Sequence, residues 1–317
     1  EGMYRVLAWV VAVMLPPMAI FFPLFTYLED LGYLPRVAFN LDKTFAKAHA
    51  CGKQALTTCM GFGCNAAGVI GCRIIDSPRE RLIAILTNNF APCNGRFPTL
   101  ISILTMFSLG SAAGLTFLVS RLLSATVLKG VPSSFTLELP PYRRPQLGKV
   151  LIRSVFDRTL FVLGRAITVA APAGILLWVM ANVGIQGQSL LAWASGFLDP
   201  LGRFMGLDGV ILIAFILGFP ANEIVIPIII MAYMANGSLI EMSSLSAMKS
   251  LFLAQGWTLT TAVCTLIFVL FHWPCSTTCL TVYKETRSIK WTVAAILIPT
   301  VCGVVCCSLA ALILRLF

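Results

Sequence analysis

The chain has 317 residues, of which 58% are hydrophobic and only 11% are charged, and its mean hydropathy is +0.89. Soluble domains carry about 25% charged residues, so this composition excludes a soluble enzyme, a disordered chain and a nucleic-acid-binding protein. In a membrane protein, the net charge of +10 marks cytoplasmic loops rather than a site for a polyanion.

Apolar runs long enough to cross a bilayer follow one another along the chain. A crossing helix needs about 20 apolar residues. We predict six full crossings, at 3–28, 82–107, 112–128, 164–183, 256–283 and 291–315. The fold class is therefore an all-α, multi-pass membrane protein.

Two further apolar runs, 54–75 and 209–236, are interrupted by turn-prone residues. The first contains GFGCN at 61–65 and the second contains GFPANE at 218–223. Irregular backbone at membrane depth is tolerated only where protein or a water-filled cavity satisfies its polar groups. We interpret both runs as re-entrant hairpins, each of which enters and leaves the membrane on one face.

The breaks recur in the same order in each half of the chain. The first hairpin is followed by APCNGR at 91–96, and the second by WPCSTT at 273–278. This order predicts two copies of one module, and paired broken helices in two halves are typical of a transporter binding site. The predicted domains are a first membrane repeat at 1–128, a cytoplasmic linker with an interfacial helix at 129–163, and a second membrane repeat at 164–317.

The basic residues support this topology. If the two runs are hairpins, one face of the membrane collects 18 of the 23 Lys and Arg residues, whereas the opposite loops hold only Arg203 and Lys249. Such an excess makes the first face cytoplasmic. The first half then has an odd number of crossings, so the second copy is predicted to be inverted. The basic segments are 29–54, 73–81, 121–165 and 284–290.

The four breaks carry side chains that can bind a metal ion. Thiol and amide groups suit soft or borderline cations rather than Mg²⁺ or Ca²⁺, and an isolated carboxylate within an apolar run is expensive and usually functional. If the copies face each other, these side chains converge near the midplane of the membrane. The candidate metal ligands are Cys64, Asn65, Cys93, Asn222, Glu223 and Cys275.

Each candidate also has a structural interpretation. The cysteines can serve as small packing residues, and Glu223 can serve as a hydrogen-bonding partner. Arg96 either pairs with a helix C-terminus or contacts a substrate, and His272 is either a metal ligand or a hydrogen-bonded packing residue. The sequence has no phosphate-binding loop and no HExxH motif, so it is not read as an enzyme.

Several motifs resemble the membrane domain of the bacterial ferrous iron transport protein B family. In the first half they are LEDLGY at 28–33, GFGCN at 61–65, DSPRERL at 76–82, and Cys93 followed by Arg96. In the second half they are ELPPY at 138–142, NEIV at 222–225, Pro274-Cys275 and KET at 284–286. The chain departs from the family pattern at Ala66-Ala67, at Asn222 and at the additional Cys279.

The resemblance implies that Fe²⁺ enters the cell as the transported substrate, with Cys64, Cys93 and Cys275 on its path and Glu223 at a family acidic position. It implies two gate modules in a multi-pass protein of the bacterial plasma membrane, with no permanently bound cofactor. GTP is expected to act only through a GTPase domain outside this chain. The expected partners are membrane lipids, Fe²⁺, that GTPase domain and small accessory Feo proteins, without nucleic acid; a homo-oligomer is left open.

Three other functions stay open at this point, of which a membrane thiol oxidoreductase is the weakest because the sequence has no CxxC motif. A nucleoside or organic-solute carrier would use the same gate modules, but aromatic and amide groups would then be expected at the breaks in place of thiols. A non-transporting membrane assembly protein of the gate type is the second alternative, and the isolated carboxylate of Glu223 argues against it.

Overall fold

The computed structural model describes residues 2–46, 51–107, 161–185, 188–235 and 244–316. The regular secondary structure of these residues is helical apart from one short antiparallel pair of strands, in which β1 (Gly184–Ile185) pairs with β2 (Gln188–Ser189). The described helices of the first half are α1 (Gly2–Asp30), α2 (Tyr33–Ala46), α3 (Lys53–Gly63), α4 (Asn65–Gly71), η1 (Cys72–Ile74), α5 (Pro78–Asn88) and α6 (Phe97–Met106). Those of the second half are α9 (Phe161–Asn182), α10 (Leu190–Phe204), α11 (Gly209–Leu217), η3 (Asn222–Ile224), α12 (Val225–Tyr233), α13 (Leu245–Ala254), α14 (Leu259–Phe271), α15 (Ser276–Thr286) and α16 (Ile289–Leu316).

Among the described residues, three segments are long and apolar enough to cross a membrane: Tyr4–Leu28, Leu259–Thr286 and Ile289–Arg315. They correspond to three of the predicted crossings. The pair α10–α11, bent by 110°, would count as a fourth if it is one broken span. Residues 164–183 form an apolar helix, α9, that is shorter than a standard span over its described apolar part, Ile167–Asn182.

The crossings predicted at 82–107 and 256–283 each consist of two helices. α5 ends at Asn88 and α6 begins at Phe97, while α14 ends at Phe271 and α15 begins at Ser276. Each gap contains a Pro-Cys pair, and proline has no N–H to continue a helix. The predicted crossing at 112–128 and the linker and interfacial helix at 129–163 lie largely or wholly outside the described residues.

The run 54–75 is a hairpin. Its two ends are joined by an ion pair, in which Lys53 Nζ lies 2.6 Å from Asp76 Oδ2. This ammonium holds the pKa of the Asp76 carboxyl below its ordinary value. A run of this length that crossed the membrane would separate its ends by about 30 Å, so α3 and α4 must enter and leave on one face.

The second run is also a hairpin. Asp208, which caps the first turn of α11, accepts a hydrogen bond from the hydroxyl of Tyr233 at the end of α12. The indole of Trp257 donates to the same hydroxyl at 2.8 Å. The open end of the second hairpin, where its chain enters at Asp208 and leaves at Tyr233, therefore lies beside the start of α14.

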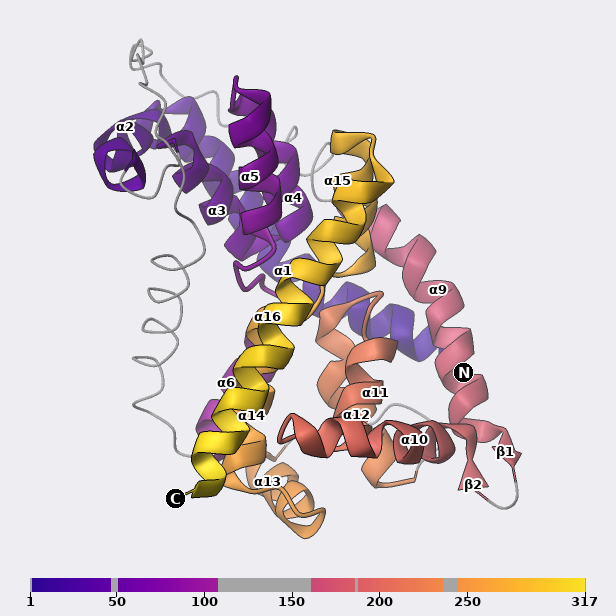
Figure 1. Ribbon diagram of the computed structural model, residues 1–317. Coiled ribbons are helices and arrows are strands. Elements are labelled where there is room, and N and C mark those ends of the chain that lie inside the picture. Colours follow the sequence, from indigo (N-terminus) through magenta and orange to yellow (C-terminus); the bar gives the residue numbers. More distant parts are fainter. Residues whose placement is uncertain (1, 47–50, 108–160, 186–187, 236–243, 317) are drawn as a thin grey trace.

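The two hairpins open on opposite faces. The broken span α14–α15 starts beside Tyr233, at the open end of the second hairpin. It ends at Glu285, whose carboxylate accepts hydrogen bonds from Arg73 Nη2 and Nε at 2.6 and 2.8 Å. Arg73 lies in η1, directly after α4, so the C-terminal end of α15 lies at the open end of the first hairpin. In Figure 1, α3–α5 gather at one end of the molecule and α10 and α13 at the other, with α16 running between them. The contacts thus confirm the predicted inverted arrangement.

The opening helices of the two halves also lie together, since α1 packs along α9. The largest core cluster is centred on the second half, where Ile211, Phe215, Ile228 and Phe268 are almost completely buried. α14 packs along α16 beside this cluster. The hairpins therefore pack among the longer helices, and this packing positions their breaks.

Impermeant thiol labelling checks this arrangement. In a background with the exposed Cys59 replaced by serine, Arg79→Cys and Lys284→Cys should be labelled from one face of the membrane and Ser250→Cys from the other. Labelling of residues 79 and 250 from the same face would contradict the inverted hairpins.

Candidate functional site

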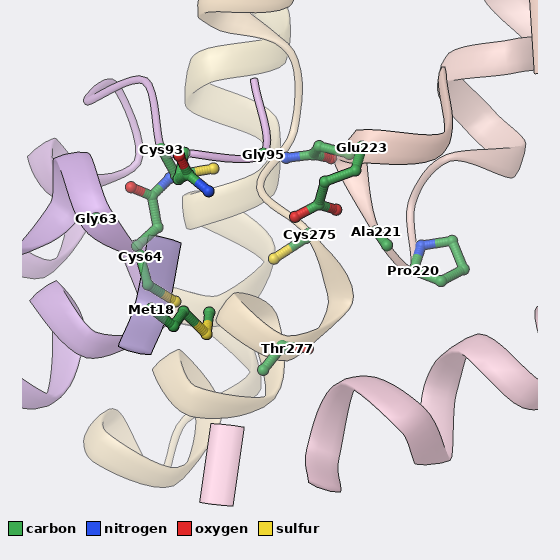
Figure 2. Close-up of a pocket in the computed structure, with 13 residues that line it drawn as sticks. Met18, Gly63, Cys64, Cys93, Gly95, Pro220, Ala221, Glu223, Cys275 and Thr277 are labelled. Carbon is green, nitrogen blue, oxygen red and sulfur yellow. The ribbon is translucent and has the colours of Figure 1, made fainter. Parts of the chain in front are cut away.

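The four helix breaks meet in one place. Cys64 is an extended residue between α3 and α4, and Cys93 lies in the loop that joins α5 to α6. Glu223 lies in η3, after the loop that follows α11, and Cys275 is the N-cap of α15. Figure 2 shows these four side chains around a common cavity.

The breaks are paired in the same way in both halves. Asn94, the residue after Cys93, donates its backbone N–H to Gly63 O at 3.4 Å. Ser276, the residue after Cys275, donates its backbone N–H to Phe219 O at 2.9 Å. Because backbone groups at membrane depth need partners, each Pro-Cys break satisfies part of the hairpin break that precedes it. This shared contact is structural support for the internal repeat.

The cavity between the breaks is small, at about 30 Å³. That space admits one or two water-sized particles, such as an ion stripped of most of its hydration. All six residues predicted from the sequence line it. The full lining consists of Met18, Gly63, Cys64, Asn65, Cys93, Asn94, Gly95, Pro220, Ala221, Asn222, Glu223, Cys275 and Thr277.

Glu223 brings a carboxyl group into this cavity. Of the thirteen lining residues it is the one with an ionisable carboxyl group, and it is only 7% exposed. It lies against Gly95, where an added Cβ would stand 2.6 Å from Glu223 Oε1. A side chain at position 95 would therefore displace the carboxyl group of Glu223, which comes from the opposite half.

The side-chain amides of Asn65 and Asn222, both predicted metal ligands, also form hydrogen bonds within the protein. In the orientation that satisfies its hydrogen bonds, the Asn65 amide donates to Gly61 O at 3.0 Å and Ala91 O at 3.1 Å. Asn222 Oδ1 lies 3.4 Å from His272 Nε2. Both amides thus help to hold the breaks in shape.

Arg96 and His272 have structural roles. Arg96 is 1% exposed, does not line the cavity, and donates from its guanidinium to the carbonyls of Leu270, His272 and Trp273 at 2.8, 3.1 and 3.4 Å. These carbonyls lie at or just after the C-terminal end of α14. Of the two predicted roles of Arg96, the structure therefore supports pairing with a helix C-terminus. His272 Nδ1 lies 2.9 Å from Val269 O, and its ring packs against Phe215.

One lining residue was not singled out from the sequence. Met18 belongs to the buried side of α1, which also carries Val10 and Phe25. Its seven- or eight-residue spacing from these neighbours is what a packed helix face shows, and α1 is helical throughout. No local signal distinguished Met18 from an ordinary core residue.

The cavity is not a closed, preformed metal centre. Within the described part of the chain, no group of three or more His, Cys, Asp or Glu side chains is arranged to hold a metal ion. Structural metal sites bring all their ligands to bonding distance at once. The lining thus offers soft and charged groups without the geometry of permanent binding.

Comparison with known proteins agrees with this architecture. The Gate family, described as nucleoside recognition, matches residues 11–107 and 163–289. The family described as the ferrous iron transport protein B C terminus matches residues 99–157. The two Gate matches confirm that one module occurs twice.

The chain is similar to proteins named Fe(2+) transporter FeoB. It is 29% identical to that of Staphylococcus aureus (strain MSSA476) over 314 residues, which is 92% of this chain and 45% of the relative. The relative from Methanocaldococcus jannaschii is 29% identical over 313 residues, with 90% and 45% covered, and that from Synechocystis is 28% identical over 301 residues, with 90% and 48% covered.

The chain thus spans slightly less than half the length of these curated relatives. No solved structure matches it significantly. Its apolar spans and the two Gate matches make it a multi-pass protein of the plasma membrane. The chain belongs to the Gate family and corresponds to the membrane portion of FeoB-type proteins.

Proposed function

We propose that this chain conducts Fe²⁺ across the membrane through the cavity at its four helix breaks. The observation that carries the proposal is that three cysteines and one glutamate, contributed by both halves, line one small space. The name of the relatives, Fe(2+) transporter, supports the choice of cation.

The chemistry of the lining suits such an ion. Thiolate and thioether groups replace lost hydration for a borderline cation better than for Mg²⁺ or Ca²⁺, whereas the carboxyl and amide oxygens can bind any of these divalent cations. Cysteine binds metal as the thiolate, so binding releases protons. A nucleoside carrier would be expected to carry aromatic and amide groups at the breaks, whereas three of the residues that line this cavity are cysteines, and this argues against the organic-solute alternative.

The path requires the halves to move. α15 packs along α4, and the Arg73–Glu285 ion pair ties the same two regions together on the predicted cytoplasmic side. An ion bound in the cavity can leave toward that side once α15 separates from α4. Alternating access by movement of one repeat against the other is the usual behaviour of inverted-repeat transporters.

Coupling to GTP belongs to the same proposal. A GTPase domain outside these residues, together with small accessory Feo proteins, would supply the energy and its control. The membrane portion itself needs no resident cofactor, because Fe²⁺ is its cargo. Membrane lipids surround the exposed apolar helices, and the predicted linker at 129–163 would connect the repeats on the cytoplasmic side.

Uptake of Fe²⁺ by proteoliposomes or cells tests the proposal. Cys64→Ser, Cys93→Ser and Cys275→Ser should each lower the initial rate, because serine is a harder and weaker ligand for this cation. Cys302→Ser is the matched control, since Cys302 lies on α16 and does not line the cavity. Rates equal to the wild type in all three cavity variants would exclude the cysteines from the path, and a wild type that takes up no Fe²⁺ even when supplied with the GTPase domain would favour a non-transporting role.

A further inference from the structure

A fourth sulfur atom borders the cavity in addition to the three thiols. Met18 is 5% exposed and belongs to a small buried cluster with Cys64, Ala66 and Ala67. Figure 2 shows the end of its side chain beside Cys64, on the edge of the cavity that faces α1. A thioether and a thiol from different helices are therefore adjacent.

Its position distinguishes Met18 from its neighbours on the same helix. Val6 and Val10 belong to the large core cluster, and Phe25 packs against Leu34 and Met60. None of these three side chains lines the cavity. Two small alanines, Ala66 and Ala67, lie next to Met18 at the start of α4, and their size leaves room for a long flexible side chain to reach Cys64.

Thioether chemistry differs from that of the other lining groups. It carries no charge and has no proton to lose, so it adds a ligand at membrane depth without the cost of another buried ion. Carboxylate and amide oxygens bind many divalent cations, whereas a thioether favours soft and borderline ones. A methionine beside a cysteine therefore changes selectivity more than total charge.

We propose that Met18 is a specificity-determining residue, whose thioether contacts the cation beside Cys64 and favours soft or borderline cations over harder ones such as Mn²⁺. The inference rests on the proposed function, because it concerns the same cavity. It adds a ligand from α1, a helix outside the four breaks. The opening helix then takes part directly in the choice of cation.

Binding of Cd²⁺ and Mn²⁺ to the purified chain tests this inference without transport. Cd²⁺ is a soft probe that is not oxidised or reduced, and its bonds to sulfur absorb in the ultraviolet. Met18→Leu keeps the volume of the side chain and removes the sulfur. It should weaken Cd²⁺ binding on the order of tenfold, a modest effect for one ligand, and change Mn²⁺ binding by less than about twofold.

Met60→Leu is the matched control, because Met60 is also buried, at 8% exposure, but does not line the cavity. It should leave both affinities unchanged. The inference is overturned if Met18→Leu binds Cd²⁺ as the wild type does, if it weakens both cations equally, if Met60→Leu gives the same loss, or if the wild type binds no Cd²⁺. A wild type that binds Cd²⁺ but takes up no Fe²⁺ even when supplied with the GTPase domain would overturn the proposed function alone, so the two failures are distinguishable.

Discussion

Replacement of Glu223 by glutamine should lower Fe²⁺ uptake by a factor on the order of ten or more. Glutamine keeps the size of the side chain and removes the charge. Glu223 has the one carboxyl group among the residues that line the cavity, so no other described side chain there can supply a carboxylate to a dication. A tenfold change corresponds to about 1.4 kcal/mol, which is small beside the interaction of a buried carboxylate with a bound cation.

The measurement is the initial rate of Fe²⁺ uptake into proteoliposomes at several Fe²⁺ concentrations. Glu80→Gln is the control, since Glu80 lies in the first turn of α5, outside the cavity. Unchanged uptake by Glu223→Gln would remove the carboxylate from the path and leave it a structural role.

Gly95→Ala tests the position of the Glu223 carboxyl group rather than its presence. Its added methyl would stand 2.6 Å from Glu223 Oε1 and 2.7 Å from the carboxyl carbon, so the carboxyl group must move. The far end of a flexible side chain can yield, and we therefore expect the fold to persist while uptake falls. A variant with normal uptake would show that the path does not require the present position of Glu223.

Replacement of Arg96 by methionine should destabilise the protein by about 3 kcal/mol. The guanidinium satisfies carbonyls at the end of α14, including those of Leu270 and His272, and each buried carbonyl left without a partner costs about 1–3 kcal/mol. The loss is partly offset because methionine needs no hydration, whereas burial of a guanidinium is expensive. Since these contacts join the two halves, their loss weakens the interface around the cavity.

Thermal unfolding in detergent measures this effect. A loss of about 3 kcal/mol corresponds to a fall in Tm of roughly 5–10 °C for a chain of this size. Arg203→Met is the control, because Arg203 is an exposed side chain paired with Asp199, and exposed ion pairs contribute about 0–1 kcal/mol. If Arg96→Met lost uptake with no change in Tm, Arg96 would act on the substrate instead.

The hairpins could be predicted because their signals are local. GFGCN and GFPANE interrupt apolar runs, and the basic residues fall on one side of the predicted topology. The Lys53–Asp76 ion pair and the Asp208–Tyr233 hydrogen bond show each run returning to its own face. The bilayer selects each segment by its own hydropathy and charge. Membrane segments and their orientation can therefore be predicted without knowledge of the tertiary contacts.

The roles of single side chains were less accessible. Asn65 stays a predicted metal ligand, and the structure adds that its amide nitrogen donates hydrogen bonds to the backbone of its own half. Arg96 had two interpretations that spacing could not separate, since its partner Leu270 lies 174 residues away. Met18 looked like any other residue of a packed helix face.

The sequence by itself determined that the chain is a helical membrane protein, where its helices break, and which chemical groups stand at the breaks. Only the tertiary structure decided that both halves contribute to a single cavity, that Gly95 faces Glu223, and that Met18 reaches Cys64. The bilayer imposes helices and breaks on each segment separately. The contents of the cavity depend instead on how two inverted copies dock, and docking brings together residues that no local pattern relates.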